Sequence, residues 1–326
     1  MPGDRAPMIA SCGEALVDFV PAGGGPGSWH ELLGGSPYNI ARGLGRLGTP
    51  CAFVGAVSKD MFGEELVRGL EEAGVDLAEV QRSSRPTTLS FVGGLDTGGP
   101  SYAFYSAEAA DRHFASEDPA TLAGQFSALH FGSNSLALEP GAQAFEALAR
   151  AAAASRLVSL DPNVRPRLIA DPRLVADRDG YLERVRRIIG LCTVLKLSDE
   201  DLSVLEPGAR GLPPGEVAAE LLRSGPALVV LTRGSDGATA WTATATVTVP
   251  ALPVRVVDTI GAGDGFMAAI LAFLAEHDLL GRPAVEAMDT AILTAMLECA
   301  ARVAATVCTR RGADMPARDE LVDVPV

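Results

Sequence analysis

Short apolar runs alternate with amphipathic stretches along most of this chain. This alternation is typical of parallel strands joined by crossover helices that cover both faces of a sheet. We therefore predict an α/β fold, a three-layer arrangement in which a mostly parallel sheet is flanked by helices. The expected strands are Met8–Gly13, Cys51–Ala56, Ala128–Phe131, Leu157–Leu160, Thr193–Leu197 and Ala227–Thr232. The expected helices are Pro37–Leu47, Phe62–Ala73, Ala142–Ala154, Pro214–Arg223, Ala262–Ala275 and Ala284–Val307.

One region breaks the alternation. Thr88–Leu95 and Ser101–Ser106 both look like strands, and Asp96-Thr97-Gly98-Gly99-Pro100 joins them. A glycine-rich connection between two strand-like runs predicts a β-hairpin. A hairpin inserted into an α/β domain suits a flap over a ligand site, and an edge extension of the main sheet is the alternative.

The chain is long enough to bury a large core, because 48% of its 326 residues are hydrophobic. No linker rich in proline or serine divides it, so we expect a single domain over residues 1–326. Within that domain, we expect a β lid formed from parts of about 14–35 and 86–112.

Charge and cysteine usage narrow the partners and the compartment. The net charge is -14, which disfavours a broad nucleic-acid surface. The five cysteines are scattered, as expected for reduced thiols in the cytoplasm. Residues 1–7 do not resemble a signal peptide. The apolar stretches are interrupted well before the ~20 residues of a membrane span. We therefore expect a cytoplasmic protein with no nucleic-acid or membrane partner.

The segment from Asp258 to Phe266 carries the strongest chemical signal. Gly261-Ala262-Gly263 stands directly before a helical apolar pattern, so it lies where a helix begins. Backbone N–H groups at a helix start are unpaired and favour an anion, and glycine lets that anion approach closely. Asp264 would lie in the first turn, where it could take the proton of an attacking hydroxyl. The alternative is that Asp264 only complements the helix dipole.

A second signal is the stretch Gly34-Gly35-Ser36-Pro37-Tyr38-Asn39. Ser36 is suited to cap the following helix, and Pro37 to its first position. Gly35 permits close approach of a ligand, and the Asn39 amide suits a polyhydroxyl ligand because it both donates and accepts. A simple junction between loop and helix is the alternative.

Two further polar residues follow predicted strands. Asp18 comes soon after the first strand, and Arg165 follows the strand Leu157–Leu160. Ligands of open α/β sheets bind outside the carboxyl ends of strands. Asp18 could therefore hold two hydroxyls, and Arg165 could pair with phosphoryl or carboxylate oxygens. The alternatives are a surface carboxylate and a structural turn.

Two nucleotide-binding patterns are excluded. Gly43-Leu44-Gly45-Arg46-Leu47-Gly48 fits GxGxxG, but it lies within and at the end of a predicted helix instead of between a strand and a helix. The sequence contains no Walker A pattern of GxxxxGK followed by Ser or Thr, which disfavours the P-loop class.

Taken together, these motifs resemble those of the ribokinase-like (PfkB) carbohydrate kinases, and within them the bacterial fructokinases. Asp258-Thr259-Ile260-Gly261-Ala262-Gly263-Asp264 is similar to the family's DTxGAGD signature, and the Gly34–Asn39 stretch is similar to its amino-terminal sugar-side signature. The resemblance covers essentially the whole length of the chain.

The resemblance implies a role for each matched residue. Asp264 would be the catalytic base, and the anion hole would be Gly261, Ala262 and Gly263. The sugar would be held by Asp18, Gly34, Gly35, Asn39, Tyr105 and Arg165. The nucleotide would lie near Lys196, Asp199, Thr232, Gly234, Gly237 and Gly263. A monovalent cation such as K⁺ would be held, largely by backbone carbonyls, by Asp258, Ile260, Val307, Arg310 and Gly312.

The chain departs from the family pattern at one functional element. The family's NxxE element, tied to magnesium and phosphate, corresponds here to Lys196-Leu197-Ser198-Asp199. A lysine cannot accept hydrogen bonds, so this part of the site must be organised differently.

The function implied is ATP-dependent and Mg²⁺-dependent phosphorylation of a primary hydroxyl of a sugar, with fructose as the first choice. Alternatives in the same class are 2-keto-3-deoxygluconate, another ketose such as tagatose, a pentose such as ribose, or a nucleoside. A non-catalytic sugar-binding regulator is the alternative from a different class. Both a monomer and a homodimer are compatible with the sequence.

Overall fold

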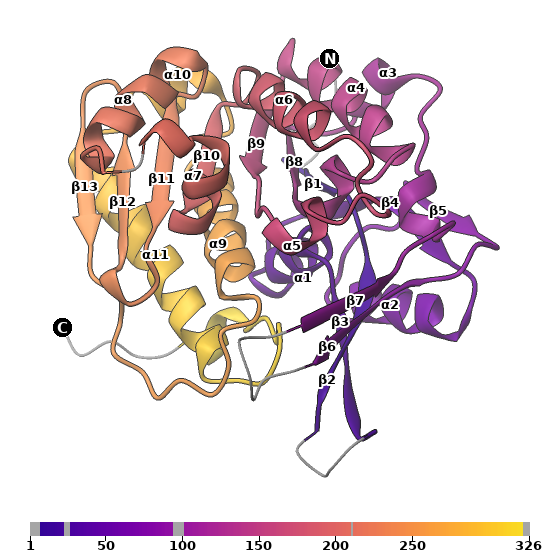
Figure 1. Cartoon of the computed structure of the whole chain (residues 1–326). Coiled ribbons are helices and arrows are strands. Elements are labelled where there is room, and N and C mark those ends of the chain that lie inside the picture. Colours follow the sequence, from indigo (N-terminus) through magenta and orange to yellow (C-terminus); the bar gives the residue numbers. More distant parts are fainter. Residues whose placement is uncertain (1–6, 23–26, 94–100, 210, 322–326) are drawn as a thin grey trace.

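The computed structural model describes residues 7–22, 27–93, 101–209 and 211–321. A nine-stranded sheet forms its centre, as Figure 1 shows. From one edge to the other its strands are β13 (Thr246–Val249), β12 (Ala238–Trp241), β11 (Leu228–Thr232), β10 (Val194–Ser198), β9 (Leu157–Asp161), β8 (Ala128–Gly132), β1 (Ile9–Cys12), β4 (Cys51–Ser58) and β5 (Val80–Ser83). The strands from β11 to β5 are parallel, and β12 and β13 are antiparallel. The predicted α/β fold is confirmed, including all six expected strands.

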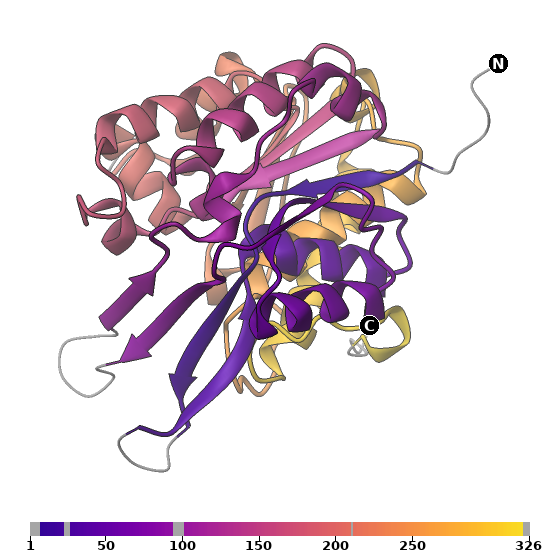
Figure 2. The ribbon, with the colours of Figure 1, turned by 90° about the vertical axis from the view of Figure 1, so that its right-hand side faces the viewer.

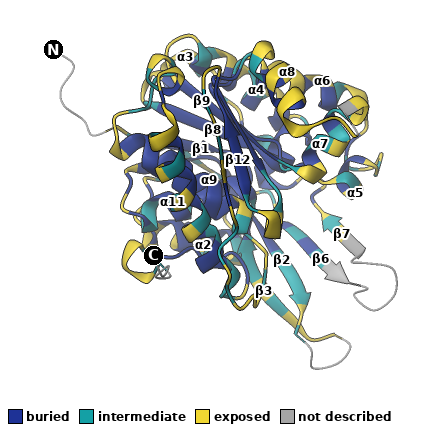
Figure 3. Cartoon of the chain, turned by 90° about the vertical axis from the view of Figure 1, so that its left-hand side faces the viewer, coloured by how far each residue is buried: buried dark blue, intermediate teal, exposed yellow. Residues whose placement is uncertain are grey.

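Helices cover both faces of this sheet, so most of its strands are buried on both sides, as Figure 3 shows. The helices on one face are α1 (Ser36–Arg46), α2 (Met61–Glu72), α9 (Ala262–Glu276) and α11 (Thr290–Cys308). Those on the other face are α3 (Pro119–Gly124), α4 (Gly141–Ala153), α6 (Arg178–Ile189) and α8 (Pro214–Ser224). Three short helices complete the set: α5 (Pro166–Ile169), α7 (Asp199–Leu205) and α10 (Arg282–Glu286).

One expected helix is divided. The sequence predicted a continuous helix over Ala284–Val307, whereas α10 ends at Glu286 and α11 begins at Thr290. The break has a local cause, because the Asp289 side chain accepts the Ile292 N–H at 2.9 Å and caps α11.

Helix α11 is long and apolar enough, by length and composition alone, to cross a membrane. The expectation that every apolar stretch is interrupted too early is wrong for this helix, which tolerates Glu298 and Arg302. Its apolar side chains have another explanation, because Leu293, Leu297 and Val303 are buried in the same core cluster as α9.

A separate four-stranded sheet, called the small sheet below, projects from one end of the molecule (Figure 2). Its strands, in order, are β3 (Trp29–Gly34), β2 (Leu16–Pro21), β6 (Thr88–Gly93) and β7 (Ser101–Tyr105). The predicted hairpin is therefore present as β6 and β7, and the alternative of an edge extension of the main sheet is wrong. Its predicted turn at Asp96–Pro100, like residues 23–26 of the expected lid, lies outside the described residues.

The glycines of the GxGxxG stretch serve helix packing. Gly43 and Gly45 lie inside α1, which confirms that the stretch does not open a dinucleotide-binding turn. A Cβ at Gly45 would lie 2.1 Å from the Ala73 carbonyl oxygen, and one at Gly43 would lie 2.8 Å from the Ala268 Cβ of α9. The absent side chain of Gly43 therefore lets α1 approach α9 closely, and that of Gly45 lets α1 approach the end of α2.

Replacing Gly43 by valine should therefore separate α1 from α9. We expect Gly43→Val to lower the free energy of unfolding by ~1–3 kcal/mol, the usual cost of overpacking. Urea unfolding would measure it. Gly124→Val in α3 is the control, because a Cβ there meets nothing within 4 Å. Equal stability of the two variants would contradict the packing role of Gly43.

Candidate active site

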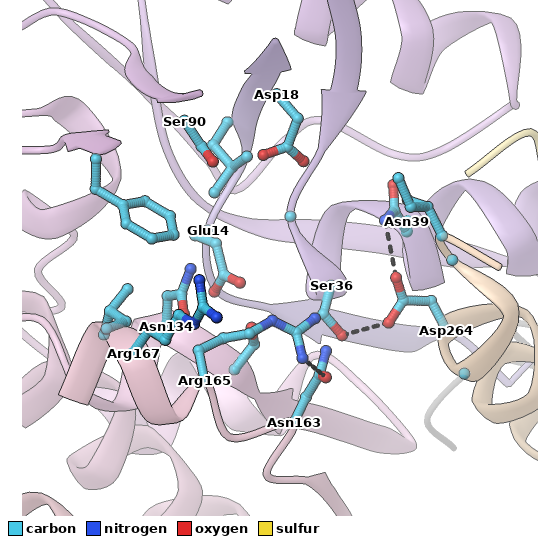
Figure 4. Close-up of a pocket in the computed structure, with 18 of the residues that line it drawn as sticks. Glu14, Asp18, Ser36, Asn39, Ser90, Asn134, Asn163, Arg165, Arg167 and Asp264 are labelled. Carbon is cyan, nitrogen blue, oxygen red and sulfur yellow. Dashed lines mark hydrogen bonds between the residues drawn. The ribbon is translucent and has the colours of Figure 1, made fainter. Parts of the chain in front are cut away.

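A cavity of about 590 Å³ lies where the carboxyl ends of the parallel strands meet the small sheet (Figure 4). This is the position that ligands occupy in open α/β sheets. The small sheet contributes Leu16, Asp18, Val20, Ser90 and Phe104, and the helix starts of α1 and α9 contribute Gly35, Ser36, Asn39, Gly261, Gly263 and Asp264. The remaining polar lining comes from the carboxyl ends of the main strands, the segments that follow them and the starts of α5 and α7: Glu14, Ser133, Asn134, Asn163, Arg165, Arg167, Lys196 and Glu200.

Asp264 is the most tightly held side chain of this cavity. It lies in the first turn of α9 and is only 7% exposed. The Ser36 hydroxyl donates to its Oδ1 at 2.6 Å, and the Asn39 amide donates to its Oδ2 at 2.8 Å (Figure 4). Both donors stand on α1, so two helix starts meet at this carboxylate. The carboxylate is thereby oriented and faces the cavity that also contains Asp18.

Ser36 has a different role from the predicted one. The sequence suggested that it caps α1, but the residue at the N-cap is Gly35, and no side chain caps the helix. A tertiary contact is the reason: the Ser36 hydroxyl donates its hydrogen bond to Asp264, which is distant in the sequence. The sequence carried no signal for this pairing.

The start of α9 matches the predicted anion-binding geometry in part. Gly261 has φ 80° at the N-cap, and a Cβ there would lie 2.6 Å from that of Ala313, so two constraints require glycine. Gly261 and Gly263 line the cavity. Ala262 does not, and its N–H is already bonded to the Thr259 carbonyl at 3.2 Å. Of the three residues predicted to form an anion hole, Gly261 and Gly263 therefore face the cavity, whereas the Ala262 N–H is used within the turn.

A buried ion pair lies beneath Gly263. Lys196 Nζ is 2.7 Å from Asp161 Oδ2, and both side chains are at most 5% exposed. A Cβ at Gly263 would lie 3.2 Å from that ammonium nitrogen, so the cation stands directly under the start of α9. Burial raises the pKa of Asp161 to about 6, although the charge of Lys196 opposes the rise.

The acidic residues at the start of α7 occupy different environments. Asp199 is exposed at the start of α7 and does not line the cavity, whereas Glu200 does. Asp201 is 2% exposed and accepts the Val164 N–H at 2.6 Å and the Ser198 hydroxyl at 2.6 Å. The Ser-x-x-Asp spacing from Ser198 is a capping box, and that signal could have identified Asp201.

The small sheet presents Asp18 to the cavity. Asp18 pairs in register with Ser90 of β6, and Ser90 pairs with Phe104 of β7, so the three side chains share one face. Burial raises the pKa of Asp18, while a hydrogen bond from Ser90 and the charge of Arg165 oppose that rise. This placement agrees with the predicted contact between Asp18 and a ligand.

Tyr105 is placed away from the cavity. The sequence assigned it to the sugar end of the site, but it is 64% exposed, and its ring contacts Phe91 at 5.7 Å between centroids. Successive side chains of a strand point to opposite faces, so Phe104 lines the cavity in its place. The alternation of side chains along β7 was the signal that could have distinguished Phe104 from Tyr105.

The two glycines before α1 have different roles. Gly35 lines the cavity with φ 104°, and a Cβ there would lie 2.6 Å from the Glu14 carbonyl oxygen. Gly34 does not line the cavity. A Cβ at Gly34 would lie 2.6 Å from Asp18 Oδ2, so its absence makes room for that carboxylate.

Arg165 stands at the start of α5 and points into the cavity, where it donates to the Asn163 side chain (Figure 4). Arg167, which the sequence analysis did not select, also lines the cavity. Two guanidinium groups from one loop can therefore meet an anionic group in the same space.

The predicted nucleotide loop lies outside the cavity lining but at the same edge of the sheet. Thr232 ends β11, next to β10, and donates its hydroxyl to the Leu197 carbonyl at 3.2 Å. Gly234 and Gly237 form the turn to β12 with φ 52° and 84°. A ligand that extended from Lys196 along this edge would reach the turn.

The residues predicted to hold a cation are brought together by Asp258. Its Oδ1 accepts the Ile260 N–H at 3.0 Å, and its Oδ2 accepts the Gly312 N–H at 2.9 Å. The Arg310 N–H bonds to the Val307 carbonyl at 3.0 Å. Asp258 thus connects the loop before α9 to the loop after α11. Both oxygens of its carboxylate accept hydrogen bonds from backbone amides.

The buried ion pair yields a stability prediction. Lys196→Met leaves Asp161 buried without its cation, which should cost ~3–5 kcal/mol of unfolding free energy. The pKa of Asp161 is already raised, so the loss should grow as the pH rises through that folded pKa and should be smallest near pH 4. Chemical denaturation at pH 4 and pH 8 measures both effects.

Lys59→Met is a matched control, because Lys59 is exposed and the chain has only these two lysines. The double variant Lys196→Met/Asp161→Asn should recover part of the loss, since it leaves no unpaired charge. A Lys196→Met protein as stable as Lys59→Met at pH 8 would contradict the importance of the pair.

Comparison with known proteins gives the same assignment as the geometry. The model of the pfkB family carbohydrate kinases matches residues 6–320. A fructokinase of Rhizobium leguminosarum bv. trifolii is 40% identical over 284 residues, covering 86% of this chain and 84% of the relative. A fructokinase structure with bound ATP from Xylella fastidiosa superposes with a TM-score of 0.86 at 31% identity and 97% coverage of both chains. The chain therefore belongs to the pfkB family of carbohydrate kinases.

Proposed function

We propose that this chain transfers the γ-phosphoryl group of ATP to a primary hydroxyl of fructose. Family membership makes it a sugar phosphotransferase. The fructokinases to which it is similar support fructose as the acceptor, and the ATP-bound fructokinase supports ATP as the donor. The observation that carries the proposal is Asp264, held by Ser36 and Asn39 at a glycine-lined helix start inside the cavity.

Asp264 acts as the general base. Its two oxygens are oriented by one hydrogen bond each, and a carboxylate oxygen has a further lone pair with which to accept a proton. The sugar hydroxyl donates to this carboxylate, loses its proton to it and attacks the γ-phosphorus in line. Asp18 and Arg165 hold the other end of the acceptor in the same cavity.

The charge of the transferring phosphoryl group is met by two sources. The unpaired amides and dipole of the α9 start face it. The Lys196 ammonium, which lies beneath Gly263, adds a full positive charge close to these amides. Preorganised charges of this kind stabilise a transition state without reorganisation. The nucleotide extends from here over the turn that contains Thr232, Gly234 and Gly237.

Two parts of the site are suited to hold metal ions, one for Mg²⁺ and one for K⁺. Glu200 lines the cavity with an exposed carboxylate, a suitable outer ligand for hydrated Mg²⁺, which would neutralise phosphate charge. The joined loops around Asp258 and Gly312 would supply carbonyl oxygens to K⁺.

A second acceptor class is favoured by one observation. Arg165 and Arg167 both line the cavity, and two guanidinium groups would suit the carboxylate of a sugar acid such as 2-keto-3-deoxygluconate. A sugar panel in a coupled ADP-release assay separates the two, since only one acceptor should give the higher kcat/KM.

The net charge of the chain and its free cysteines bear on its compartment and partners. A net charge of -14 and free cysteines such as Cys12 and Cys51 support a cytoplasmic enzyme that works as a monomer or homodimer without a nucleic-acid partner.

Asp264→Asn tests the proposed base. The variant keeps the side-chain shape: its amide oxygen can accept from Asn39, and its NH2 group can donate to the Ser36 hydroxyl. We therefore expect its thermal unfolding and sugar binding to stay close to wild type. Turnover should fall by a factor of at least ~10², because no carboxylate remains to take the proton. The ADP-release assay measures turnover.

The matched control is Asp179→Asn, which makes the same chemical change at an exposed position of α6. Its turnover should equal that of wild type. If Asp264→Asn turned over fructose at nearly the wild-type rate, Asp264 would not be the base.

A further inference from the structure

Strand β1 contains a buried hydroxyl group that the proposed mechanism does not use. Ser11 is the third residue of β1, which lies between β8 and β4 in the main sheet, and it is 0% exposed. The other residues of the strand are apolar and buried: Ile9, Ala10 and Cys12. A buried hydroxyl requires a hydrogen-bond partner, whereas an apolar side chain of similar size would not. The partner of Ser11 therefore indicates what its hydroxyl does.

That partner is the start of α1. The Ser11 hydroxyl donates to the Pro37 carbonyl oxygen at 2.7 Å, across 26 positions of the sequence. Ile9 and Ser11 lie on the same face of β1, and Ile9 is buried in the same core cluster as α1. Pro37 is the second residue of α1, so the bond joins the centre of the main sheet to the first turn of the helix.

Two close contacts hold the same turn against the end of β1. A Cβ at Gly13 would lie 2.5 Å from the Pro37 Cγ. A Cβ at Gly35 would lie 2.6 Å from the Glu14 carbonyl oxygen. Packing of this kind limits how near the turn can come to the strand. The hydrogen bond from Ser11 adds a preferred direction, because it weakens steeply when its angle changes.

Helix α1 begins without a local capping group. Its N-cap is Gly35, and no side chain among the described residues caps it. A side-chain cap would normally pair a free amide and help to fix the first turn. Its first turn also contains no acidic residue that could complement the helix dipole. The position of this helix start is therefore set mainly by its contacts with β1.

The same turn carries both donors to the proposed base. Ser36 precedes Pro37, and Asn39 follows it by two positions. These two side chains donate to the two oxygens of Asp264, as Figure 4 shows. The orientation of the carboxylate thus depends on the position of the turn. A displacement of about 1 Å in a positioning element can lower a rate by about 100-fold.

We propose that Ser11 is a positioning residue for phosphoryl transfer, whose hydroxyl fixes the start of α1 and thereby the orientation of the Asp264 carboxylate. The proposal rests on the proposed function, because it takes Asp264 as the base. Ser11 itself is fully buried and does not belong to the cavity lining, so it acts through the backbone at Pro37.

Ser11→Ala removes the hydroxyl and leaves a small buried side chain in the strand. With fructose and ATP in the ADP-release assay, we expect kcat to fall by about 10-fold, because the base is no longer held in line with the acceptor hydroxyl. KM for both substrates should stay within about 3-fold of wild type, since no substrate contact is lost. Ser11→Cys keeps a weaker donor, so its kcat should lie between those of wild type and Ser11→Ala.

Cys51→Ala is the matched control for a general loss of packing. Cys51 lies on β4, is 2% exposed and donates its thiol to the Ala41 carbonyl at 3.4 Å. It therefore also bonds the main sheet to α1, but beyond the turn that carries Ser36 and Asn39. Its removal should leave kcat at the wild-type value. A fall in kcat as large as that of Ser11→Ala would contradict a role confined to the first turn.

A double variant tests whether Ser11 acts through the base. Asp264→Asn has no carboxylate left to orient, so Ser11→Ala/Asp264→Asn should turn over within about 2-fold of Asp264→Asn alone. A purely structural effect of Ser11→Ala would instead lower turnover by a further factor of about 10, because independent effects add in free energy. That second result would overturn the proposal.

The remaining outcomes separate this inference from the proposed function. If Ser11→Ala is folded and has the wild-type kcat, its bond to Pro37 does not position the base, while the kinase assignment stands. If wild type releases no ADP with any sugar, the proposed function fails and this inference fails with it. Thermal unfolding shows whether each variant is folded. If Ser11→Ala is not, Ser11→Cys decides alone, and a wild-type kcat in that variant overturns the proposal.

Discussion

The contact on which the site depends is the pair of hydrogen bonds that Ser36 and Asn39 donate to Asp264. A carboxylate that is 7% exposed is stable only with such partners, because its desolvation is expensive. These donors stand on α1 and the acceptor on α9, so the two helices must pack closely. The bare surface of Gly43 against Ala268 permits that approach. The packing of α1 against α9 therefore also sets the geometry of the Asp264 carboxylate.

A second layer of charge lies under the first. Lys196 occupies a position where the family pattern has a hydrogen-bonding side chain, and it is paired with Asp161 at 2.7 Å. Asp201 lies close enough to both for its charge to act on them, and its own oxygens hold the Val164 and Ser198 backbone amides. A buried cation requires buried anions, so the change to lysine is accommodated by its neighbours. The result is a fixed positive charge beneath the start of α9.

The small sheet forms another wall of the cavity. Because successive side chains of a strand point to opposite faces, only one of its faces lines the cavity. Asp18, Ser90 and Phe104 face the cavity, while Phe19, Phe91 and Tyr105 belong to aromatic contacts outside its lining. The aromatic contacts stiffen the sheet, and the inner face closes over the carboxyl ends of the main strands. The small sheet thereby forms one wall of the cavity at the carboxyl ends of the main strands.

The sequence determined six parallel strands of the main sheet, the hairpin of β6 and β7, and the glycine-lined start of α9 with Asp264 in its first turn, because these depend on local periodicity and on contiguous motifs. It also selected Asp18, Asn39 and Arg165, which line the cavity, although Asp18 lies within β2 of the small sheet and not at the end of a main-sheet strand. It failed where the outcome depends on distant partners: Ser36 bonds to Asp264 instead of capping α1, and the burial of Asp201 near Lys196 was not predicted. Only tertiary structure decided these pairings, since a side chain's partner is set by which backbones pack together, and no local pattern records that.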